Sequence, residues 1–419
     1  MLKFVLLLWV YWVVLACWSQ RNLTSDAKTV TDVLCSPLME GRGYVDNGCN
    51  KAGIYLLQEF ERIGLAPLNG YAKQSFYINV NRFPGACKIK IHGHKKAPGI
   101  DYLIHPSSAS FHGKLSFIGL SAAEVLSVPF NATSPKQAIA FIQPKQISRD
   151  TLRMVRAKLE KLARMKVPVV EYTRDKLTWS VSSEQFKAPY IHVFDTSERV
   201  LPNPIKIKLE AEFVENYEVS NILGVVASKQ PSDSFIIVSA HYDHLGRMGK
   251  NTYFPGANDN ASGVAMLLSL AKEIQQQPLQ NHHVLFIAFA GEEIGLEGSR
   301  FFVDQHILGS DQISCVLNLD IMGSGEEGIT VVNGAIHKAL FQRLLDLNER
   351  TQSVPVIKPR GKAANSDHYP FSEAGIPAIF IYTMGPNKNY HDIHDKAAAL
   401  SFDRFDQLHY LLLRFIQSF

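Results

Sequence analysis

The sequence predicts an α/β fold with a mixed, mostly parallel central sheet flanked by helices, and a smaller, mainly-β domain inserted into it. From residue 219 onward, apolar runs of strand length alternate with longer amphipathic segments, which is the pattern of a sheet covered by helices on both faces. From residue 95 to 213 the pattern changes to short strands with one or two helices between them. The chain has 419 residues, 46% of them hydrophobic, and is long enough for two domains.

The periodicity of the apolar residues predicts the individual elements. In the main domain, strands are expected at residues 75–80, 87–92, 221–227, 235–240, 283–290, 315–319, 329–333 and 378–382. Helices are expected there at residues 51–63, 261–276, 297–306, 336–351 and 402–419. Strands of the insert are expected at residues 115–118, 138–142, 167–170 and 205–209. The main domain should therefore comprise residues 25–94 and 214–419, and the insert residues 95–213.

The N-terminus has the features of an export leader. Lys3 precedes an apolar run at residues 4–16, and the sequence turns polar at Ser19. This run is shorter than the roughly 20 apolar residues that a membrane-spanning helix needs, so residues 1–19 are expected to be a signal or lipoprotein leader. Cys17 follows Val-Leu-Ala, as in a bacterial lipoprotein processing site. The protein is expected to be exported, either periplasmic or extracellular, or tethered to a membrane through a lipidated Cys17.

Charge and cysteine content exclude some classes of partner and site. The 43 basic and 39 acidic residues nearly balance, and the most basic stretch, residues 149–166, has the apolar spacing of a solvated amphipathic helix. No nucleic-acid partner is therefore expected. The cysteines after Cys17 lack the spacing of a zinc site. Pairing of Cys35 with Cys49 stays open, as does the oligomeric state, and Cys315 is expected to be buried in a strand.

Acidic and imidazole side chains follow the predicted strands of the main domain. Three strands are followed by His241 with Asp243, by Glu292 with Glu293, and by Asp320. The carboxyl ends of such strands form the edge where open α/β sheets bind ligands, so these side chains should meet there. Asp259 stands just before a helix and His391 follows the last strand, and both can reach the same edge.

Two imidazoles and three carboxylates form a ligand set suited to zinc, with manganese or cobalt as substitutes. The candidate ligands are His241, Asp259, Glu293, Asp320 and His391. Five protein ligands exceed what one catalytic zinc takes, so two zinc ions per chain are expected, with Asp259 between them. His241 and Asp320 would complete one site, and Glu293 and His391 the other.

The remaining polar residues at this edge predict hydrolysis. Glu292 is expected to be the general base, which takes a proton from the water between the two metals and so produces the attacking hydroxide. Asp243 would orient the imidazole of His241. Tyr390 could donate a hydrogen bond to the tetrahedral intermediate.

The order of these motifs resembles that of the zinc aminopeptidases of the M28 family. The matching segments are SAHYDHLG, GANDNASG, AFAGEEIGLEGS, NLDIMG, SDHYPF and YHDIHD, with LMEGRG nearer the N-terminus. The resemblance implies the zinc-peptidase fold and the same metal and base roles, position by position. It favours His391 over His394, because Asp395 then falls four residues later. The insert resembles a protease-associated domain.

The predicted function is a metal-dependent exopeptidase, most simply an aminopeptidase acting on the N-terminal residues of peptide substrates. Two alternatives stay open: a carboxypeptidase or dipeptidase with the same chemistry, and a glutaminyl cyclase, which shares the fold but uses one zinc. A protein that binds without catalysing is disfavoured, because no predicted ligand or base is missing from the sequence.

Overall fold

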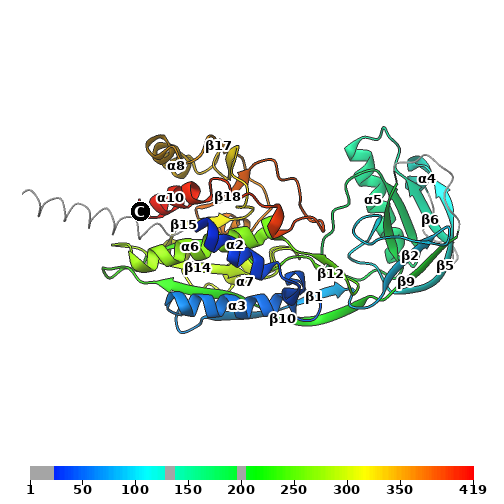
Figure 1. Cartoon of the computed structure of the whole chain (residues 1–419), viewed down its shortest axis with the longest axis horizontal. Coiled ribbons are helices and arrows are strands. Elements are labelled where there is room, and N and C mark those ends of the chain that lie inside the picture. Colours follow the sequence, from blue (N-terminus) through cyan, green and yellow to red (C-terminus); the bar gives the residue numbers. More distant parts are fainter. Residues whose placement is uncertain (1–22, 128–136, 196–203) are drawn as a thin grey trace, which may run out of the picture.

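The computed structural model describes residues 23–127, 137–195 and 204–419. The predicted leader at residues 1–19, with Cys17, lies outside them. Two sheets lie toward opposite ends of an elongated molecule, with the C-terminal helix at the end away from the insert (Figure 1). Within the described residues, no helix is both long and apolar enough to cross a membrane.

The sheet of the main domain has eight strands and is mixed, as predicted. Its order is β1 (Lys73–Arg82), β10 (Glu212–Val226), β14 (His283–Phe289), β11 (Phe235–His241), β15 (Ile313–Leu319), β18 (Ala378–Met384), β16 (Gly328–Val332) and β17 (Ile357–Pro359). The four central strands, β14, β11, β15 and β18, are parallel to one another. The pairs β1–β10, β10–β14 and β16–β18 are antiparallel. The parallel centre brings the carboxyl ends of its strands to one edge.

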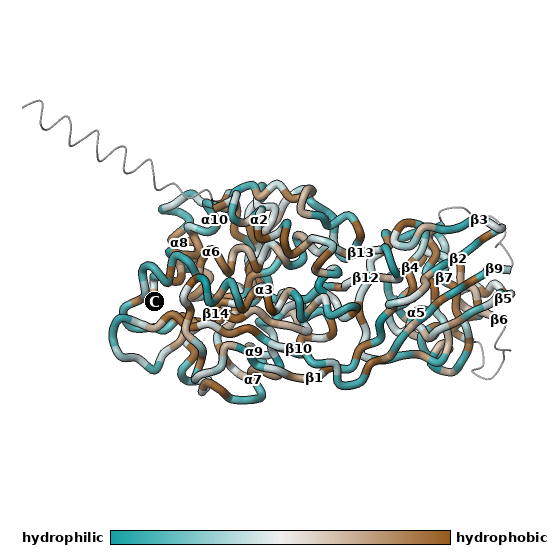
Figure 2. Tube along the Cα trace, turned by 60° about the horizontal axis from the view of Figure 1, so that its bottom comes forward, coloured by the Kyte–Doolittle hydropathy of each residue, from teal (hydrophilic) through white to brown (hydrophobic). Residues whose placement is uncertain are grey.

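Helices cover both faces of this sheet. They are α2 (Leu23–Leu34), α3 (Gly48–Ile63), α6 (Ser262–Gln276), α7 (Glu297–Asp304), α8 (Lys338–Thr351), α9 (His368–Glu373) and α10 (Phe405–Ile416). Within β11, Ile236 and Val238 pack with α6 and α10, whereas Ile237 packs on the other face with Phe302 of α7 and Phe371 of α9. Burial on both faces explains why the sequences of these strands are continuous apolar runs. In Figure 2 brown, hydrophobic stretches of the tube lie inside the lobe that contains this sheet.

The insert forms a second eight-stranded sheet with two helices. Its order is β3 (His94–Lys95), β2 (Cys87–Ile91), β9 (Ile205–Leu209), β5 (Phe111–Leu120), β6 (Gln137–Ile142), β7 (Val169–Thr173), β8 (Tyr190–Phe194) and β4 (Tyr102–Ile104). The helices are α4 (Ala122–Ser127) and α5 (Arg149–Arg164). Leu152, Val155 and Leu159 of α5 are buried against the sheet, so its basic residues lie on the solvated side of an amphipathic helix, as predicted.

The structure places one strand differently from the sequence prediction. The strand Cys87–Ile91, expected in the main domain, pairs with β9 in the second sheet. The reason is the length of β1 and β10, which pair antiparallel from Lys73 to Arg82, so the chain enters the insert directly after β1. The hairpin of β12 (Gly246–Met248) and β13 (Thr252–Phe254) adds Met248 and Phe254 to the insert's core, so the two lobes share apolar contacts.

Candidate metal centre

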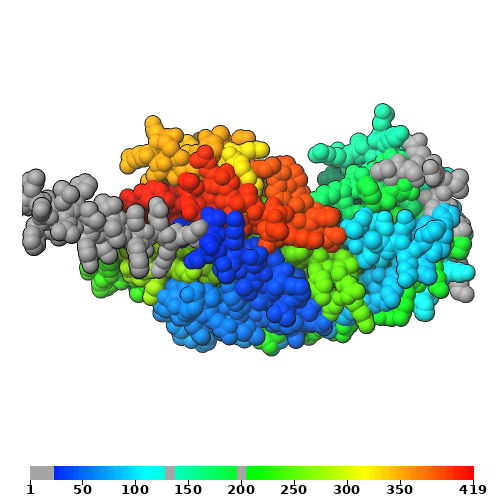
Figure 3. Space-filling view, viewed as in Figure 1, coloured from blue at the N-terminus to red at the C-terminus, as the bar shows by residue number. Residues whose placement is uncertain are grey.

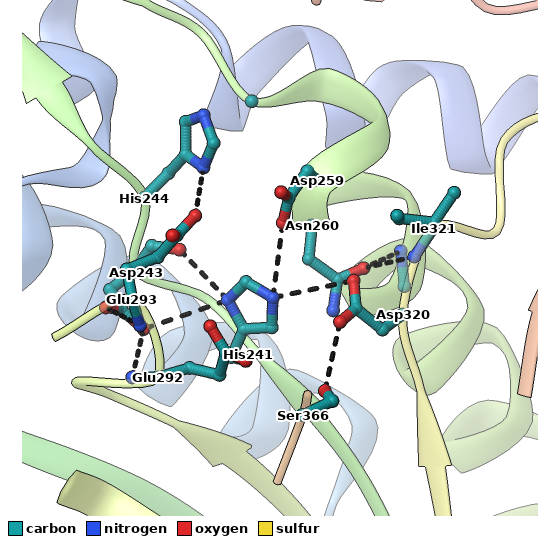
Figure 4. Close-up of polar contacts among 12 residues, drawn as sticks. His241, Asp243, His244, Asp259, Asn260, Glu292, Glu293, Asp320, Ile321 and Ser366 are labelled. Atoms are coloured by element: carbon teal, nitrogen blue, oxygen red, sulfur yellow. Dashed lines mark hydrogen bonds and ion pairs between the residues drawn. The ribbon is translucent and has the colours of Figure 1, made fainter. Parts of the chain in front are cut away.

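The predicted site residues meet at the carboxyl edge of three adjacent strands. His241 is the last residue of β11, Asp320 follows β15 directly, and the Glu292–Glu293 pair follows β14. Asp259 reaches the same place from the turn Ala257–Ala261, which leads into α6. Figure 4 shows their side chains converging around the imidazole of His241.

The imidazole of His241 is held in the form that can bind a metal through Nε2. Its Nδ1 lies 3.2 Å from the backbone carbonyl oxygen of Asp243. A carbonyl oxygen only accepts hydrogen bonds, so Nδ1 carries the proton and Nε2 keeps a free lone pair. That Nε2 lies 3.3 Å from Asp259 Oδ1 and 3.5 Å from Asp320 Oδ1. These three residues can share one metal ion.

His391 has the corresponding arrangement on the other side of Asp259. Its Nδ1 lies 2.8 Å from the backbone carbonyl oxygen of Trp179, a residue of the insert, so Nε2 is again the unprotonated atom. Nε2 lies 3.1 Å from Asp259 Oδ2 and 3.2 Å from Glu293 Oε2. Asp259 therefore presents one oxygen to each imidazole, which is the geometry of a bridging carboxylate. The rejected alternative, His394, is exposed.

His244 is a further candidate ligand that the sequence analysis did not select. Its Nδ1 lies 2.7 Å from Glu293 Oε1, and it can share a metal ion with Asp259 and Glu293. Its Nε2 is buried without a hydrogen-bond partner in the described structure. The SAHYDH motif contained the signal, because a second imidazole stands three residues after His241.

The chemistry of this cluster fits bound cations. Asp243, Asp259, Asp320 and Asp367 are buried in one region, and the partly buried Glu292 and Glu293 lie beside them. Buried carboxylates need compensating positive charge. Asp320 Oδ1 is buried and hydrogen-bonded to no described residue, whereas Oδ2 accepts from the Ser366 hydroxyl at 3.0 Å. Burial raises the pKa of Asp259, but when His241 and His391 carry a second proton on Nε2, hydrogen bonds from their imidazoles hold that pKa well below its ordinary value.

Asp243 fixes the turn that carries the two glutamates. Its carboxylate accepts hydrogen bonds from the backbone amides of Glu292 (3.1 Å) and Glu293 (3.3 Å) and from the Tyr44 hydroxyl (2.9 Å). The nearest Asp243 carboxylate oxygen is 3.8 Å from His241 Nδ1. The sequence predicts that this carboxylate orients the imidazole. In the structure the backbone carbonyl oxygen of Asp243 lies closer to Nδ1, because the carboxylate accepts from three other donors.

Glu292 faces the open space of the site, as Asp259 and Asp320 also do. It lines a cavity of about 230 Å³ together with His241, Asp259, Asp320 and His391. Burial and the negative charge of Glu293 raise its pKa well above the ordinary value, despite the nearby imidazole of His241. Tyr390 lines the same cavity, its ring stacked 4.0 Å from that of His391, with 47% of the residue exposed. Glu292 and Tyr390 therefore both face the space where a substrate would lie.

Two residues far apart in the sequence shape the turn that carries Asp259. The Asp395 carboxylate accepts hydrogen bonds from the amides of Asn258 (2.9 Å) and Asp259 (3.1 Å). Arg42, from the LMEGRG motif, is buried and donates to the carbonyl oxygens of Pro255 (2.6 Å) and Gly256 (2.7 Å). The motif thus belongs to the support of the candidate centre, which its position near the N-terminus did not reveal.

The fold is α/β, and its buried cluster of imidazoles and carboxylates has the composition of a metal centre. Residues 221–416 match the model described as Peptidase family M28. This range covers a little under half of the chain and contains every predicted metal ligand.

Individual curated proteins match parts of the chain. Aminopeptidase YwaD of Bacillus subtilis (strain 168) is 26% identical over 269 residues, which is 60% of this chain and 56% of the relative. A probable leucine aminopeptidase of Trichophyton verrucosum (strain HKI 0517) is 27% identical over 209 residues, covering 46% of this chain and 56% of the relative. The matched part thus spans a little over half the length of these curated relatives.

Solved structures share the fold of nearly the whole chain, the insert included. A zinc aminopeptidase from Bacillus subtilis, BSAP, matches with a TM-score of 0.72 at 19% identity, covering 95% of this chain and 96% of that one. A peptidase M28 precursor from Shewanella amazonensis SB2B matches with a TM-score of 0.69 at 13% identity, covering 94% of both chains. At such identities the likeness establishes the fold.

Proposed function

We propose that the protein is a zinc-dependent aminopeptidase that removes N-terminal residues from peptides. The observation that carries the proposal is Asp259, whose two carboxylate oxygens face the Nε2 atoms of His241 and His391 at 3.3 and 3.1 Å. The match of residues 221–416 to Peptidase family M28 and the relatives named as aminopeptidases support it.

We propose two zinc ions per chain. His241 and Asp320 would hold one, Glu293 and His391 the other, and Asp259 would contact both. When bound, the zinc ions would acidify a water molecule and polarise the scissile carbonyl. Glu292, which lines the cavity beside these ligands, would accept the proton of that water and later return it to the leaving amine. Tyr390 would donate its hydroxyl hydrogen to the oxygen that gains negative charge.

The first test is the mass of the products formed from a mixed peptide pool. The pool contains peptides with free, blocked and glutamine N-termini, and the enzyme is assayed with a chelator, without it, and after zinc is restored. We expect free peptides to lose single N-terminal residues, the chelator to abolish the loss, and zinc to restore it.

Other products would contradict the proposal in distinguishable ways. Shortening from the C-terminus would indicate a carboxypeptidase, and cleavage of dipeptides alone a dipeptidase. Loss of ammonia from glutamine-initiated peptides without shortening would indicate a glutaminyl cyclase. Shortening that persists in the chelator would refute the dependence on metal.

A further inference from the structure

The outer face of the insert sheet carries an array of lysines. In β2 and β9 the exposed positions are Lys88, Lys90, Lys206 and Lys208, which alternate with buried apolar residues. The antiparallel register sets Lys88 directly opposite Lys208, and Lys90 opposite Lys206. The array continues sideways, because Lys95 of β3 lies opposite Lys90 and Lys114 of β5 lies opposite Lys206.

Such pairing is unfavourable without a counter-charge. Like charges directly opposite each other on neighbouring strands destabilise a sheet. One carboxylate compensates locally: Glu210 lies 2.9 Å from Lys208. Within the described chain, no ion pair is formed by Lys88, Lys90 or Lys206. The strands β2 and β9 are interior strands of their sheet, so protection of an exposed sheet edge by lysines does not explain the array.

The same lysines border a cavity at the junction of the two lobes. Its volume is about 540 Å³, and Lys88, Lys90, Lys95, Lys96, Lys208 and Lys250 line it. Lys250 comes from the turn between β12 and β13, so the main domain also contributes. The array and the cavity form one continuous basic surface, because Lys88, Lys90, Lys95 and Lys208 belong to both. The strands β2 and β9 that carry it lie in the lobe away from the C-terminal helix (Figures 1 and 2).

We propose that this surface binds an acidic polysaccharide. Lysines two residues apart on a strand are about 6.6 Å apart, and neighbouring strands about 4.8 Å, so a flat array of point charges faces solvent. The exposed positions of β2 and β9 hold lysine alone. They offer no aromatic ring, which would stack on nucleic-acid bases or anchor the protein in a lipid interface. They also offer no arginine, whose planar guanidinium binds phosphate with two hydrogen bonds. A hydrated polymer of carboxylate or sulfate groups matches this surface.

The test measures binding of the full chain to heparin and to polygalacturonate as a function of salt. We expect binding that weakens with salt, and at least a tenfold loss of affinity in the variant Lys88→Gln/Lys90→Gln/Lys206→Gln/Lys208→Gln. The matched control replaces four exposed lysines of the main domain, Lys28, Lys229, Lys338 and Lys358, by Gln. It should bind like the wild type, and both variants should retain peptide hydrolysis.

The proposal is overturned if the wild type binds neither polymer, if both variants lose affinity equally, or if anionic vesicles or single-stranded DNA bind more tightly.

A second, independent observation concerns the contact between the insert and His391. Besides accepting from His391 Nδ1, Trp179 donates its own amide to the His391 carbonyl oxygen at 2.8 Å. The Trp179 ring is buried, stacks 4.6 Å from Phe254, and donates its Nε1 hydrogen to Ile104 O at 2.8 Å. In Figure 3 the orange-red segment that includes His391 lies against the insert.

Lys176 strengthens the same contact. It forms an ion pair with Asp392, whose side chain is 4% exposed, and donates to the Lys388 carbonyl oxygen at 2.7 Å. Lys176 of the insert thus holds the chain on both sides of His391, through the backbone carbonyl oxygen of Lys388 and the carboxylate of Asp392. We infer that the insert is part of the metal centre, with Lys176 as a positioning residue for His391; this inference rests on the proposed function.

Zinc affinity tests this inference directly. Competition with a chelating dye gives the dissociation constant of each bound zinc in the wild type, in Lys176→Met, and in the control Lys187→Met, which changes an exposed lysine of the same insert. We expect Lys176→Met to weaken one zinc site by about tenfold or more, with the other site and the thermal unfolding midpoint of the metal-free protein unchanged. Equal zinc affinities in wild type and Lys176→Met, or an equal loss in Lys187→Met, would overturn the inference alone. A wild type that binds no zinc would overturn the proposed function as well.

Discussion

Replacing Glu292 by Gln is expected to lower the turnover number for peptide hydrolysis by about a thousandfold while zinc binding and folding persist. Removal of a positioned general base typically costs about 10²–10⁴ in rate. Glutamine keeps the shape of the side chain but accepts no proton. Glu292 faces the cavity. Glu293 contacts His244 and His391, so it is not free to replace Glu292 as the base. Steady-state kinetics on the peptide that the wild type hydrolyses fastest provides the measurement.

The control for this variant is Glu297→Gln, which changes an exposed glutamate at the start of α7, five residues along the chain. It should hydrolyse peptides like the wild type. If Glu292→Gln keeps more than about a tenth of the wild-type rate, Glu292 is not the base. If it loses zinc together with activity, Glu292 acts as a ligand and the assignment of the glutamate pair has to be exchanged.

The candidate site was largely predictable because its residues stand at strand ends. Burial on both faces makes the central strands continuous apolar runs, and the polar residue that ends each run falls at the ligand-binding edge. His241, Glu293 and Asp320 could be placed together in this way. The residues that support this site could not be predicted, because Arg42 and Trp179 contact residues that are 200 or more positions away in the sequence. His244 stands in the same motif as His241. Its contact with Glu293, at 2.7 Å, depends on how two separate loops pack, which the sequence does not reveal.

The fold was predictable where the elements are long and periodic. The strands of the parallel centre and the helices α3, α6 and α8 lie close to the expected residues. The short helix α9 and the helix α2 were missed. Helix α9 has six residues, too few to show a period. The strand β2 was recognised, but its sheet was not, because alternating lysine and isoleucine fit either sheet and the pairing with β9 joins residues more than 110 positions apart.

Replacing Arg42 by Met is expected to destabilise the protein by about 3 kcal/mol or more. The guanidinium is buried and donates to the carbonyl oxygens of Leu34 (3.1 Å), Tyr242 (2.8 Å), Pro255 and Gly256, and at 3.4 Å to that of Asp259. Methionine fills much of the volume but leaves these buried acceptors without a donor, at about 1–3 kcal/mol for each that stays unsatisfied. The free energy of unfolding of the metal-free protein, from urea denaturation, measures the loss.

The comparison with Arg300→Met separates this role from a general loss of positive charge, because Arg300 is exposed on α7 and its replacement should change the stability by less than about 0.5 kcal/mol. Since Pro255 and Gly256 lead directly into the turn that carries Asp259, part of the loss in Arg42→Met should also appear as weaker zinc binding. A variant as stable as the wild type would mean that water or a shifted backbone satisfies the carbonyls that Arg42 contacts. A variant that is destabilised but binds zinc as tightly would mean that Asp395, through the amides of Asn258 and Asp259, is sufficient to hold the turn.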